Sequence, residues 1–241
     1  PGEEVMVSVT SAQNTSKVSA RPYTYSFRAK AGVGPSVFVP QAQSPFAIGA
    51  SPQAVVLGDI DGDGDADMVV AGGSGLLVRL NNGTGNFSSQ AMIPTIASPS
   101  AVALGDADND GDLDIVVSNS LVTSNVSILL NAGNGTFATA AGSPMTVGAS
   151  PRNVAWGDAD GDGDLDISVA DFSANGVVIL QNNGLALFTA GSLIPTSGGV
   201  ISLRFADIDN DGDLDIAAAN SSGTSCLAVL QNDGLGAYTL L

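Results

Sequence analysis

Short apolar runs recur along most of the chain, and each is bounded by glycine, asparagine or aspartate. From residue 36 onward, the same four segments return in a fixed order. The first precedes an aspartate-rich loop, the second follows that loop, the third ends in a glycine turn, and the fourth opens on an aromatic residue. Runs this short are typical of β-strands, because an amphipathic helix needs about ten or more residues at a period of about 3.6.

The repeated segments match one another closely in all four units. The first segments read AVVLGD, AVALGD, NVAWGD and SLRFAD, and the fourth segments open at Phe87, Phe137, Phe188 and Tyr238. Asn-Gly and Asp-Gly between the third and fourth segments favour hairpins, because both residues tolerate positive φ. Four short antiparallel strands per unit describe a propeller blade. The sequence therefore predicts an all-β fold, a β-propeller of four-stranded antiparallel blades with four repeats in this chain, plus a short N-terminal β segment.

One part of the repeat stands by itself before the first complete unit. Residues 38–51, FVPQAQSPFAIGAS, match residues 137–150, FATAAGSPMTVGAS, in length and in their Phe, Ser-Pro and Gly-Ala-Ser positions. Residues 38–48 are therefore interpreted as a fourth strand with no first three strands before it. This strand could complete the last blade and close a ring, which removes exposed sheet edges. Alternatively, the chain is a segment of a larger ring.

Charge divides the chain near residues 32–35. Residues 1–34 carry four of the seven basic residues and two acids, whereas residues 35–241 carry three basic residues and 22 acids. We therefore expect two domains, residues 1–34 and residues 35–241. The first holds two alternating runs, EEVMVSVTS and RPYTYSFRA, which predict a pair of β-strands. Its PGE turn, V-x-V-x-V strand and Y-x-F strand resemble the end of a bacterial immunoglobulin-like domain of the surface-layer type, so it is interpreted as the C-terminal strands of such a domain or as a linker.

The composition excludes several classes of function. The formal net charge of −17 argues against binding nucleic acid or an anionic membrane through a basic patch. No run of about eighteen apolar residues occurs, so no membrane insertion is expected. The chain has no histidine, which removes the commonest acid, base and transition-metal ligand. Because no activated serine or cysteine arrangement is visible either, we predict that the chain is not an enzyme.

The few remaining reactive or basic residues are given ordinary structural interpretations. Cys226 is the only cysteine and is interpreted as a buried thiol in a β-strand. Arg79, Arg152 and Arg204 are the only basic residues of the repeats. They are interpreted as solvated or paired with aspartate, in preference to anion binding.

A nine-residue phrase, D-x-D-x-D-G-D-x-D, occurs four times. It spans residues 59–67, 106–114, 158–166 and 207–215, and it holds twenty of the 24 acidic residues. Like charges at this density repel one another, and a bound cation compensates them. Ligand sets made only of oxygen suit calcium, whereas zinc and copper favour nitrogen or sulfur and magnesium retains more water. The sequence therefore predicts about one Ca²⁺ per repeat, four in this chain.

Each position of the phrase has an expected role. Side chains at positions 1, 3 and 5 converge as the loop curls, the glycine at position 6 permits the sharp turn, position 7 offers its backbone carbonyl, and position 9 closes the site. The position-7 side chain is expected to face solvent. An EF-hand is excluded because its position-12 glutamate is replaced by Val70, Val117, Val169 and Ala218. The candidate metal ligands are Asp59, Asp61, Asp63, Asp65, Asp67, Asp106, Asp108, Asp110, Asp112, Asp114, Asp158, Asp160, Asp162, Asp164, Asp166, Asp207, Asp209, Asp211, Asp213 and Asp215.

These loops, set between the first two strands of each unit, resemble the FG-GAP/VCBS repeats of integrin α-type calcium-binding β-propellers. The resemblance covers roughly residues 36–241. The Gly-Ala-Pro part of the signature is replaced by AGG, SNS, ADF and ANS, which places the chain among bacterial VCBS-like repeats. The resemblance implies structural calcium in the loops, and a protein or glycan partner bound on a propeller face or between blades.

From these observations we expect a calcium-stabilised interaction or adhesion module of a secreted or cell-surface bacterial protein. Millimolar external calcium would fill such loops, which favours an extracellular location. Two alternatives stay open. One is a calcium-dependent, lectin-like carbohydrate-binding propeller, and the other is a non-catalytic domain of a larger secreted enzyme.

Overall fold

The computed structural model describes residues 3–9, 23–29, 51–73, 75–88, 92–94, 98–120, 124–221 and 226–241. The chain forms two compact units, Pro1–Ser44 and Pro45–Leu241. In the first unit, β1 (Glu3–Val9) pairs antiparallel with β2 (Tyr23–Ala29), which confirms the predicted pair of strands. The immunoglobulin-like resemblance of this unit remains a prediction.

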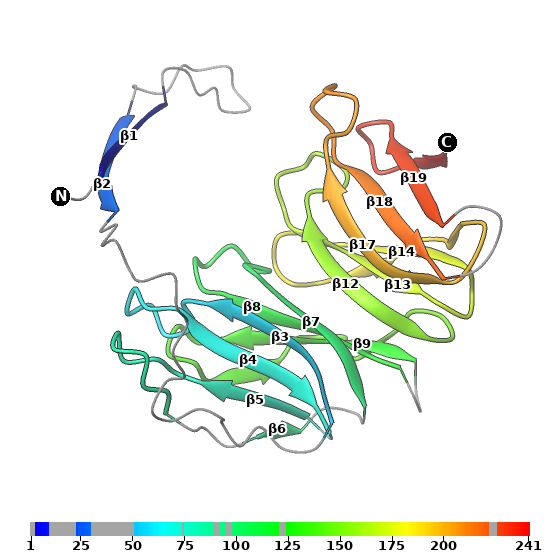
Figure 1. The fold of residues 1–241 in the computed structure, drawn as a ribbon. Coiled ribbons are helices and arrows are strands. Elements are labelled where there is room, and N and C mark those ends of the chain that lie inside the picture. Colours follow the sequence, from blue (N-terminus) through cyan, green and yellow to red (C-terminus); the bar gives the residue numbers. More distant parts are fainter. Residues whose placement is uncertain are drawn as a thin grey trace. The chain divides into compact units, whose positions relative to one another are not determined.

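The second unit contains four antiparallel sheets, here called blades 1 to 4, each made of strands that follow one another in sequence (Figure 1). Blade 1 contains β3 (Pro52–Gly58), β4 (Asp67–Gly72), β5 (Gly75–Arg79) and β6 (Ile93–Pro94). Blade 2 contains β7 (Pro99–Gly105), β8 (Asp114–Asn119), β9 (Asn125–Asn131), β10 (Phe137–Thr139) and β11 (Met145–Thr146). Blade 3 contains β12 (Pro151–Gly157), β13 (Asp166–Asp171), β14 (Gly176–Gln181), β15 (Thr189–Ala190) and β16 (Ile194–Pro195). Blade 4 contains β17 (Val200–Ala206), β18 (Asp215–Asn220), β19 (Leu227–Asn232) and β20 (Tyr238–Leu240).

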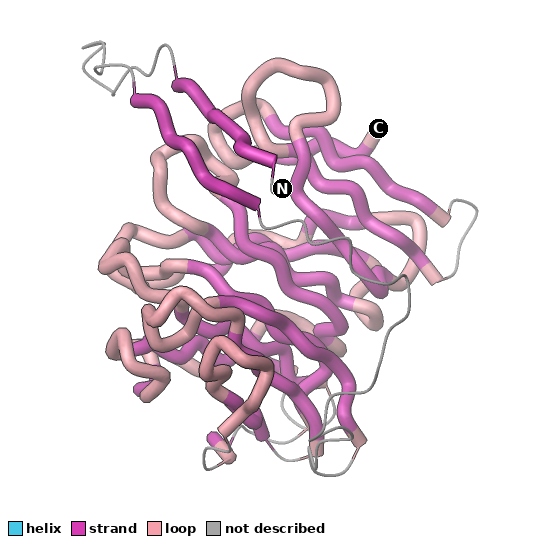
Figure 2. The backbone as a smooth tube through the Cα atoms, turned by 60° about the vertical axis from the view of Figure 1, so that its left-hand side comes forward, coloured by secondary structure: helices cyan, strands magenta, loops and turns pink. Residues whose placement is uncertain are grey.

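The predicted all-β class and the four-stranded blades are confirmed. Figure 2 shows strands and loops along the described backbone, and the described part of the chain contains no helix long and apolar enough to cross a membrane. No closure of the blades into a ring is seen in the described part of the chain. The strand predicted at residues 38–48, which was a candidate for closing it, lies outside the described residues.

The fourth strand of a blade is less regular than the sequence predicts. In blade 2 it is split into β10 and β11, which pair with opposite ends of β9. Between them, the hydroxyl of Ser143 accepts the Ile128 N–H at 2.8 Å, in place of a strand carbonyl. In blade 1, Phe87 lies outside the named strands and makes an isolated bridge to Asn81. An outer strand pairs along one edge only, so proline and side-chain acceptors interrupt it at little cost.

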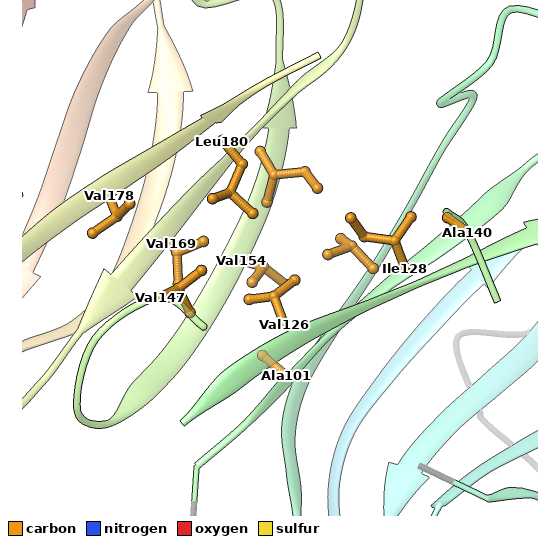
Figure 3. Packing of buried hydrophobic residues seen from close by; sticks show 11 residues of the cluster. Ala101, Val126, Ile128, Ala140, Val147, Val154, Val169, Val178 and Leu180 are labelled. Carbon is orange, nitrogen blue, oxygen red and sulfur yellow. The ribbon is translucent and has the colours of Figure 1, made fainter. Parts of the chain in front are cut away.

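The apolar core lies between successive blades. The first strands of neighbouring blades contact one another, β3 with β7, β7 with β12, and β12 with β17. Figure 3 shows Val126 of β9 beside Val154 of β12, within a cluster that also includes Ile128 and Leu180. Equivalent clusters join blades 1 and 2 and blades 3 and 4. The continuous apolar runs in the sequence therefore place apolar side chains on both faces of a sheet, and a neighbouring blade covers each of these faces where one is present.

Glycines at the ends of the first strands set the distance between blades. A Cβ at Gly105 would lie 2.7 Å from the Trp156 ring, and one at Gly157 would lie 2.5 Å from the Phe205 ring. Leu104 packs on Gly58 in the same way. Each blade thus places one large side chain over a bare backbone position of the preceding blade.

The two terminal blades each have a less covered face. Val55 and Leu57 of β3 are 62% and 61% exposed, whereas Val154, which occupies the position of Val55 in blade 3, is 3% exposed. Leu227 of β19 is 63% exposed. Cys226, just before Leu227, is exposed, so the predicted burial of this thiol is wrong. The residue lies in a bend directly before β19 and not in the strand itself, and no described blade packs on that face.

Candidate metal centres

Each aspartate-rich loop joins the first and second strands of its blade. The loop starts directly after the first strand, and the aspartate at position 9 is the first residue of the second strand. The glycine at position 6 has φ between +90° and +100° at Gly64, Gly111, Gly163 and Gly212. Side chains disfavour this conformation. The sharp turn predicted at position 6 is therefore present in all four loops.

The aspartate at position 9 fastens each loop to its own blade. Asp114 is fully buried. Its Oδ2 accepts the N–H of Ala107 at 2.8 Å, and its Oδ1 accepts the N–H of Asn131, the last residue of β9, at 2.8 Å. The same pair of hydrogen bonds is made by Asp67, Asp166 and Asp215. One carboxylate therefore ties the start of the loop to the end of the third strand.

Three carboxylates of each loop converge on one point. They are the aspartates at positions 1, 3 and 9, and each offers an oxygen within 4.8 Å of the others. Calcium–oxygen bonds are about 2.3–2.6 Å long, so oxygens around one Ca²⁺ lie within about 5 Å of each other. The four triads are Asp59, Asp61 and Asp67; Asp106, Asp108 and Asp114; Asp158, Asp160 and Asp166; and Asp207, Asp209 and Asp215.

Within the triads, some carboxylate oxygens are satisfied by the loop and others have no partner. Asp59 Oδ2 accepts the Gly64 N–H at 2.9 Å, while its Oδ1 is buried and has no hydrogen bond. Asp61 Oδ1 and Asp108 Oδ1 are likewise buried without a hydrogen bond. A buried acceptor without a partner is costly. A hard cation at the centre of the triad would satisfy these oxygens, so the residues present fit the ion.

The electrostatics of the triads also favour a cation. Burial raises the pKa of Asp114 to about 6 and that of Asp166 to about 6, although backbone N–H groups oppose the shift. The pKa values of Asp61, Asp108 and Asp160 are raised, first by burial and then by neighbouring carboxylates. These carboxylates are thus held at a distance where their negative charges repel one another. A divalent ion would relieve that repulsion.

The side chains at positions 5 and 7 are not brought into the triads. At position 5, Oδ1 accepts the N–H of position 7, as in Asp110 with Asp112 at 2.9 Å. The position-7 side chain is half-buried and lies against the hairpin glycine between the third and fourth strands. A Cβ on Gly133, for example, would come within 2.5 Å of Asp112 Oδ2. Their roles as metal ligands remain predictions.

An asparagine at the end of each third strand joins neighbouring blades. The side-chain amide of Asn131 donates to the Leu113 carbonyl of its own loop at 3.1 Å and to the Ile60 carbonyl of the preceding loop at 2.8 Å. Asn182 and Asn232 repeat this link to Ala107 and Ala159. Each loop is therefore held by its own blade and, where one follows, by the next.

Sequence reasoning missed these asparagines. They are Asn81, Asn131, Asn182 and Asn232, and they stand two residues before a glycine at the same place in every unit. The available signal was that the same polar residue, an asparagine, ends an apolar strand in every unit.

Solved structures with similar folds include a lectin and two other proteins. A lectin from Agrocybe aegerita that recognises non-reducing terminal N-acetylglucosamine is 24% identical, with a TM-score of 0.53 over 78% of this chain and 51% of the lectin. The BBS1N chain of a complex with ARL6DN is 14% identical, with a TM-score of 0.50 over 92% of this chain and 59% of that one. The biofilm matrix protein Bap1 of V. cholerae is 23% identical, with a TM-score of 0.42 over 79% of this chain and 30% of Bap1. The likenesses to the lectin and to BBS1N are of fold alone, and the chain spans about a third to three fifths of the length of each of the three structures.

Sequence comparison identifies the family. No curated protein matches the chain. The family model described as an FG-GAP-like repeat matches residues 59–117, 118–169 and 160–218. These residues include all four aspartate-rich loops with their triads, and they confirm the FG-GAP part of the resemblance seen in the sequence. The chain belongs to the FG-GAP-like repeat family.

Proposed function

We propose that the four loops bind Ca²⁺ and that the chain is a non-catalytic, calcium-stabilised interaction or adhesion module of a secreted or cell-surface protein. The observation that carries the proposal is the set of convergent carboxylate oxygens, three of which are buried without a hydrogen bond. Only oxygen ligands are present in the triads, which suits calcium. Positions 5 and 7 would supply the further oxygens that calcium requires.

The bound ion would have a structural role in each blade. The aspartate at position 9 connects its loop to the end of the third strand. The asparagine at the end of that strand connects the blade to the loop of the preceding blade. Repulsion among the carboxylates of a triad would push this junction apart, and the ion would hold it together. Calcium would therefore stabilise the contacts between blades as well as the turn itself.

Two considerations support an extracellular, non-catalytic role. Calcium sites in extracellular modules are weak, with dissociation constants of about 10⁻⁴–10⁻³ M, and only external calcium is concentrated enough to fill them. The chain lacks histidine, and twenty of its carboxylates are in the loops. An interaction module then has to use another part of the blades for its partner.

The proposal is tested by calorimetry of the full chain with calcium and with EGTA. We expect the melting temperature to be higher with calcium. Asp61→Asn should reduce calcium stoichiometry by about one ion and lose part of the calcium-dependent shift, because it weakens one triad.

The matched control is Asp233→Asn, which makes the same charge change outside the triads. Asp233 Oδ1 accepts two hairpin N–H groups, and Asn183 does the same in blade 3, so asparagine is accommodated there. A melting temperature equal in calcium and EGTA would contradict the proposal.

A carbohydrate-binding propeller is the second candidate function. The Agrocybe aegerita lectin shares the fold, which by itself says nothing about ligands here. The specific observation in its favour is a cavity of about 390 Å³ where three blades meet, at the end of the strands away from the loops, whose lining includes serine, glutamine and arginine.

A further inference from the structure

The cavity of about 390 Å³ lies at the opposite end of the blades from the aspartate-rich loops. Ser51 and Ser98, which precede the first strands of blades 1 and 2, line it together with Gly73 and Ser120, which follow the second strands. Its volume is within the range of small-molecule sites, about 300–1,000 Å³. Four of its eight lining residues are serines, and Gln53 and Arg152 also line it, so hydrogen-bonding side chains are available to a polar ligand.

A β-bulge in each first strand directs one side chain of each blade to this end. The pairing between first and second strands skips one residue in every blade, and the skipped residues are Gln53, Ser100, Arg152 and Ile201. The first three all line the cavity. Bulges redirect side chains and are frequent beside functional sites. The position is occupied by a different residue in each blade, although the surrounding strands repeat.

The bulge residue of blade 3, Arg152, is held in place by an aromatic ring. Its guanidinium carbon lies 5.1 Å from the centre of the Phe172 ring. That ring is supported in turn, because a Cβ on Gly199 would lie 2.9 Å from it and the Phe172 N–H donates to the Ser150 carbonyl at 2.9 Å. Stacking restricts the guanidinium without using its N–H donors, which stay available to a ligand.

Blades 2 and 3 are joined beside this arginine. Ser100 Oγ lies 2.9 Å from the Pro151 carbonyl, which it can reach with its proton. Pro151 precedes Arg152, so the link fixes the backbone that carries the guanidinium. The cavity is thus built from polar side chains of three blades.

Within the described residues, Arg152 has no carboxylate at ion-pair distance, so the predicted aspartate pairing is not found. Asp171 pairs with Pro151 across the strands, but its carboxylate is buried and accepts the N–H groups of Ala149, Ser150 and Ala174. The triads lie beyond the far end of a seven-residue strand, about 20 Å away. Salt screens exposed charges over about 8 Å, so the acidic loops do not neutralise this end.

We propose that this cavity binds a sugar acid, that is, a sugar residue with a carboxylate beside several hydroxyl groups. Arg152 would bind the carboxylate through two parallel N–H groups, and Ser98, Ser120 and Gln53 would bind the hydroxyls. A neutral sugar lacks the partner for Arg152, and an acidic peptide lacks the hydroxyls. This inference adds a ligand class to the proposed interaction role and rests on it for biological meaning, but it uses none of the loop residues.

The test is calorimetric titration of the full chain in calcium with galacturonic acid and with galactose, which differ only in the carboxylate. We expect galacturonic acid to bind and galactose to bind at least about tenfold more weakly, since a charge-assisted pair contributes that much. Titration with trigalacturonate shows whether the natural ligand is the end of a polymer or a free monosaccharide. Equal binding of the two monosaccharides, or no binding of any uronate, would overturn the proposal on the unaltered protein.

Two arginine variants sharpen the test. Arg152→Gln should weaken uronate binding about tenfold or more. Arg152→Lys keeps the positive charge but loses the two parallel N–H donors, so its uronate affinity should lie between those of the unaltered protein and Arg152→Gln. Arg204→Gln is the matched control, because Arg204 is exposed and bonds to Asn153 and Leu203 outside the cavity; its binding should change less than about twofold. Equal losses in Arg152→Gln and Arg204→Gln would contradict a specific site, and equal binding of N-acetylglutamate would contradict the sugar assignment. Uronate binding without a calcium-dependent melting shift rejects only the calcium proposal. A calcium-dependent melting shift without uronate binding rejects only the sugar-acid proposal.

Discussion

The two ends of the blades follow opposite rules. At the loop end, the same five aspartates and the same glycine occupy the same positions in all four blades. At the bulge end, one backbone position carries glutamine, serine, arginine or isoleucine. Both ends have the same backbone, and both are formed by the same two strands. The difference therefore reflects what each end has to do.

Geometry explains why one end is uniform. Three carboxylates must meet within 4.8 Å, and Asp114 must also reach two backbone N–H groups. Any other residue type would lose a ligand or a hydrogen bond. At the bulge, the skipped residue has no partner across the strands, so no cross-strand side-chain pair depends on which residue it is. One end is constrained by structure, and the other is free to vary with a ligand.

Removing calcium should have the largest effect of the changes considered. Four sites that each add about 1–2 kcal/mol at calcium well above the dissociation constant would together raise the melting temperature by about 10 °C or more. Differential scanning calorimetry in calcium and in EGTA measures this. A shift of only a degree or two would mean that the loop end is uniform for another reason.

Asp114→Ala should destabilise the protein by about 2–5 kcal/mol, even in EGTA. The substitution leaves the buried N–H groups of Ala107 and Asn131 without an acceptor, independently of any metal. Chemical denaturation in EGTA checks it. Asp110→Ala is the control, because Asp110 is exposed in the same loop. If both variants lost the same stability, the two hydrogen bonds of Asp114 would not be the cause.

Asn131→Ala should cost about 1–3 kcal/mol, because two carbonyls in two different loops lose a donor. Asn81→Ala provides the comparison, since Asn81 donates to the Ala66 carbonyl of its own loop and no described blade precedes it. Urea denaturation of the two variants measures the contribution of the link between blades. Equal losses would show that the bond to Ile60 adds nothing.

Acidification should reduce the benefit of calcium. In the metal-free protein, the pKa values of Asp114 and Asp166 are raised from 3.8 to about 6, so their protonated forms are favoured on folding. Their contribution to stability is fully present below about pH 4 and is lost as the pH rises through 6. Calcium needs them ionised. The difference between melting temperatures in calcium and in EGTA should therefore shrink from pH 7 to pH 5, and a constant difference would contradict this.

Gln53→Ala should have the smallest effect on stability, within about 0.5 kcal/mol. Gln53 is exposed and its amide makes a weak contact of 3.4 Å with the Ser51 carbonyl, and exposed substitutions of this kind are nearly neutral. Denaturation and uronate titration on the same variant check it. A large loss of stability would mean that the bulge end is constrained like the loop end.

The sequence determined the local features of this protein. Strand positions, hairpin glycines and the meeting of positions 1, 3 and 9 all depend on residues within a few positions of each other, so spacing predicts them. Spacing also predicts that position 5 converges with them, and its side chain is not part of the triads. The family followed from the same phrase. Burial could be predicted only where both faces of a sheet are covered, and Cys226 shows the limit, because its exposure depends on whether a blade packs there.

Only the tertiary structure decided what lies between blades. Asn131 meets Ile60 across seventy-one residues, and Trp156 packs on Gly105 of the preceding blade. The convergence of Gln53, Ser100 and Arg152 depends on three bulges and on the angle at which the blades stack. Nothing in a nine-residue pattern specifies such contacts, because they arise from how one sheet packs on the next. The aspartates explain how each blade is held together, and the packing of the blades places the cavity at the opposite end.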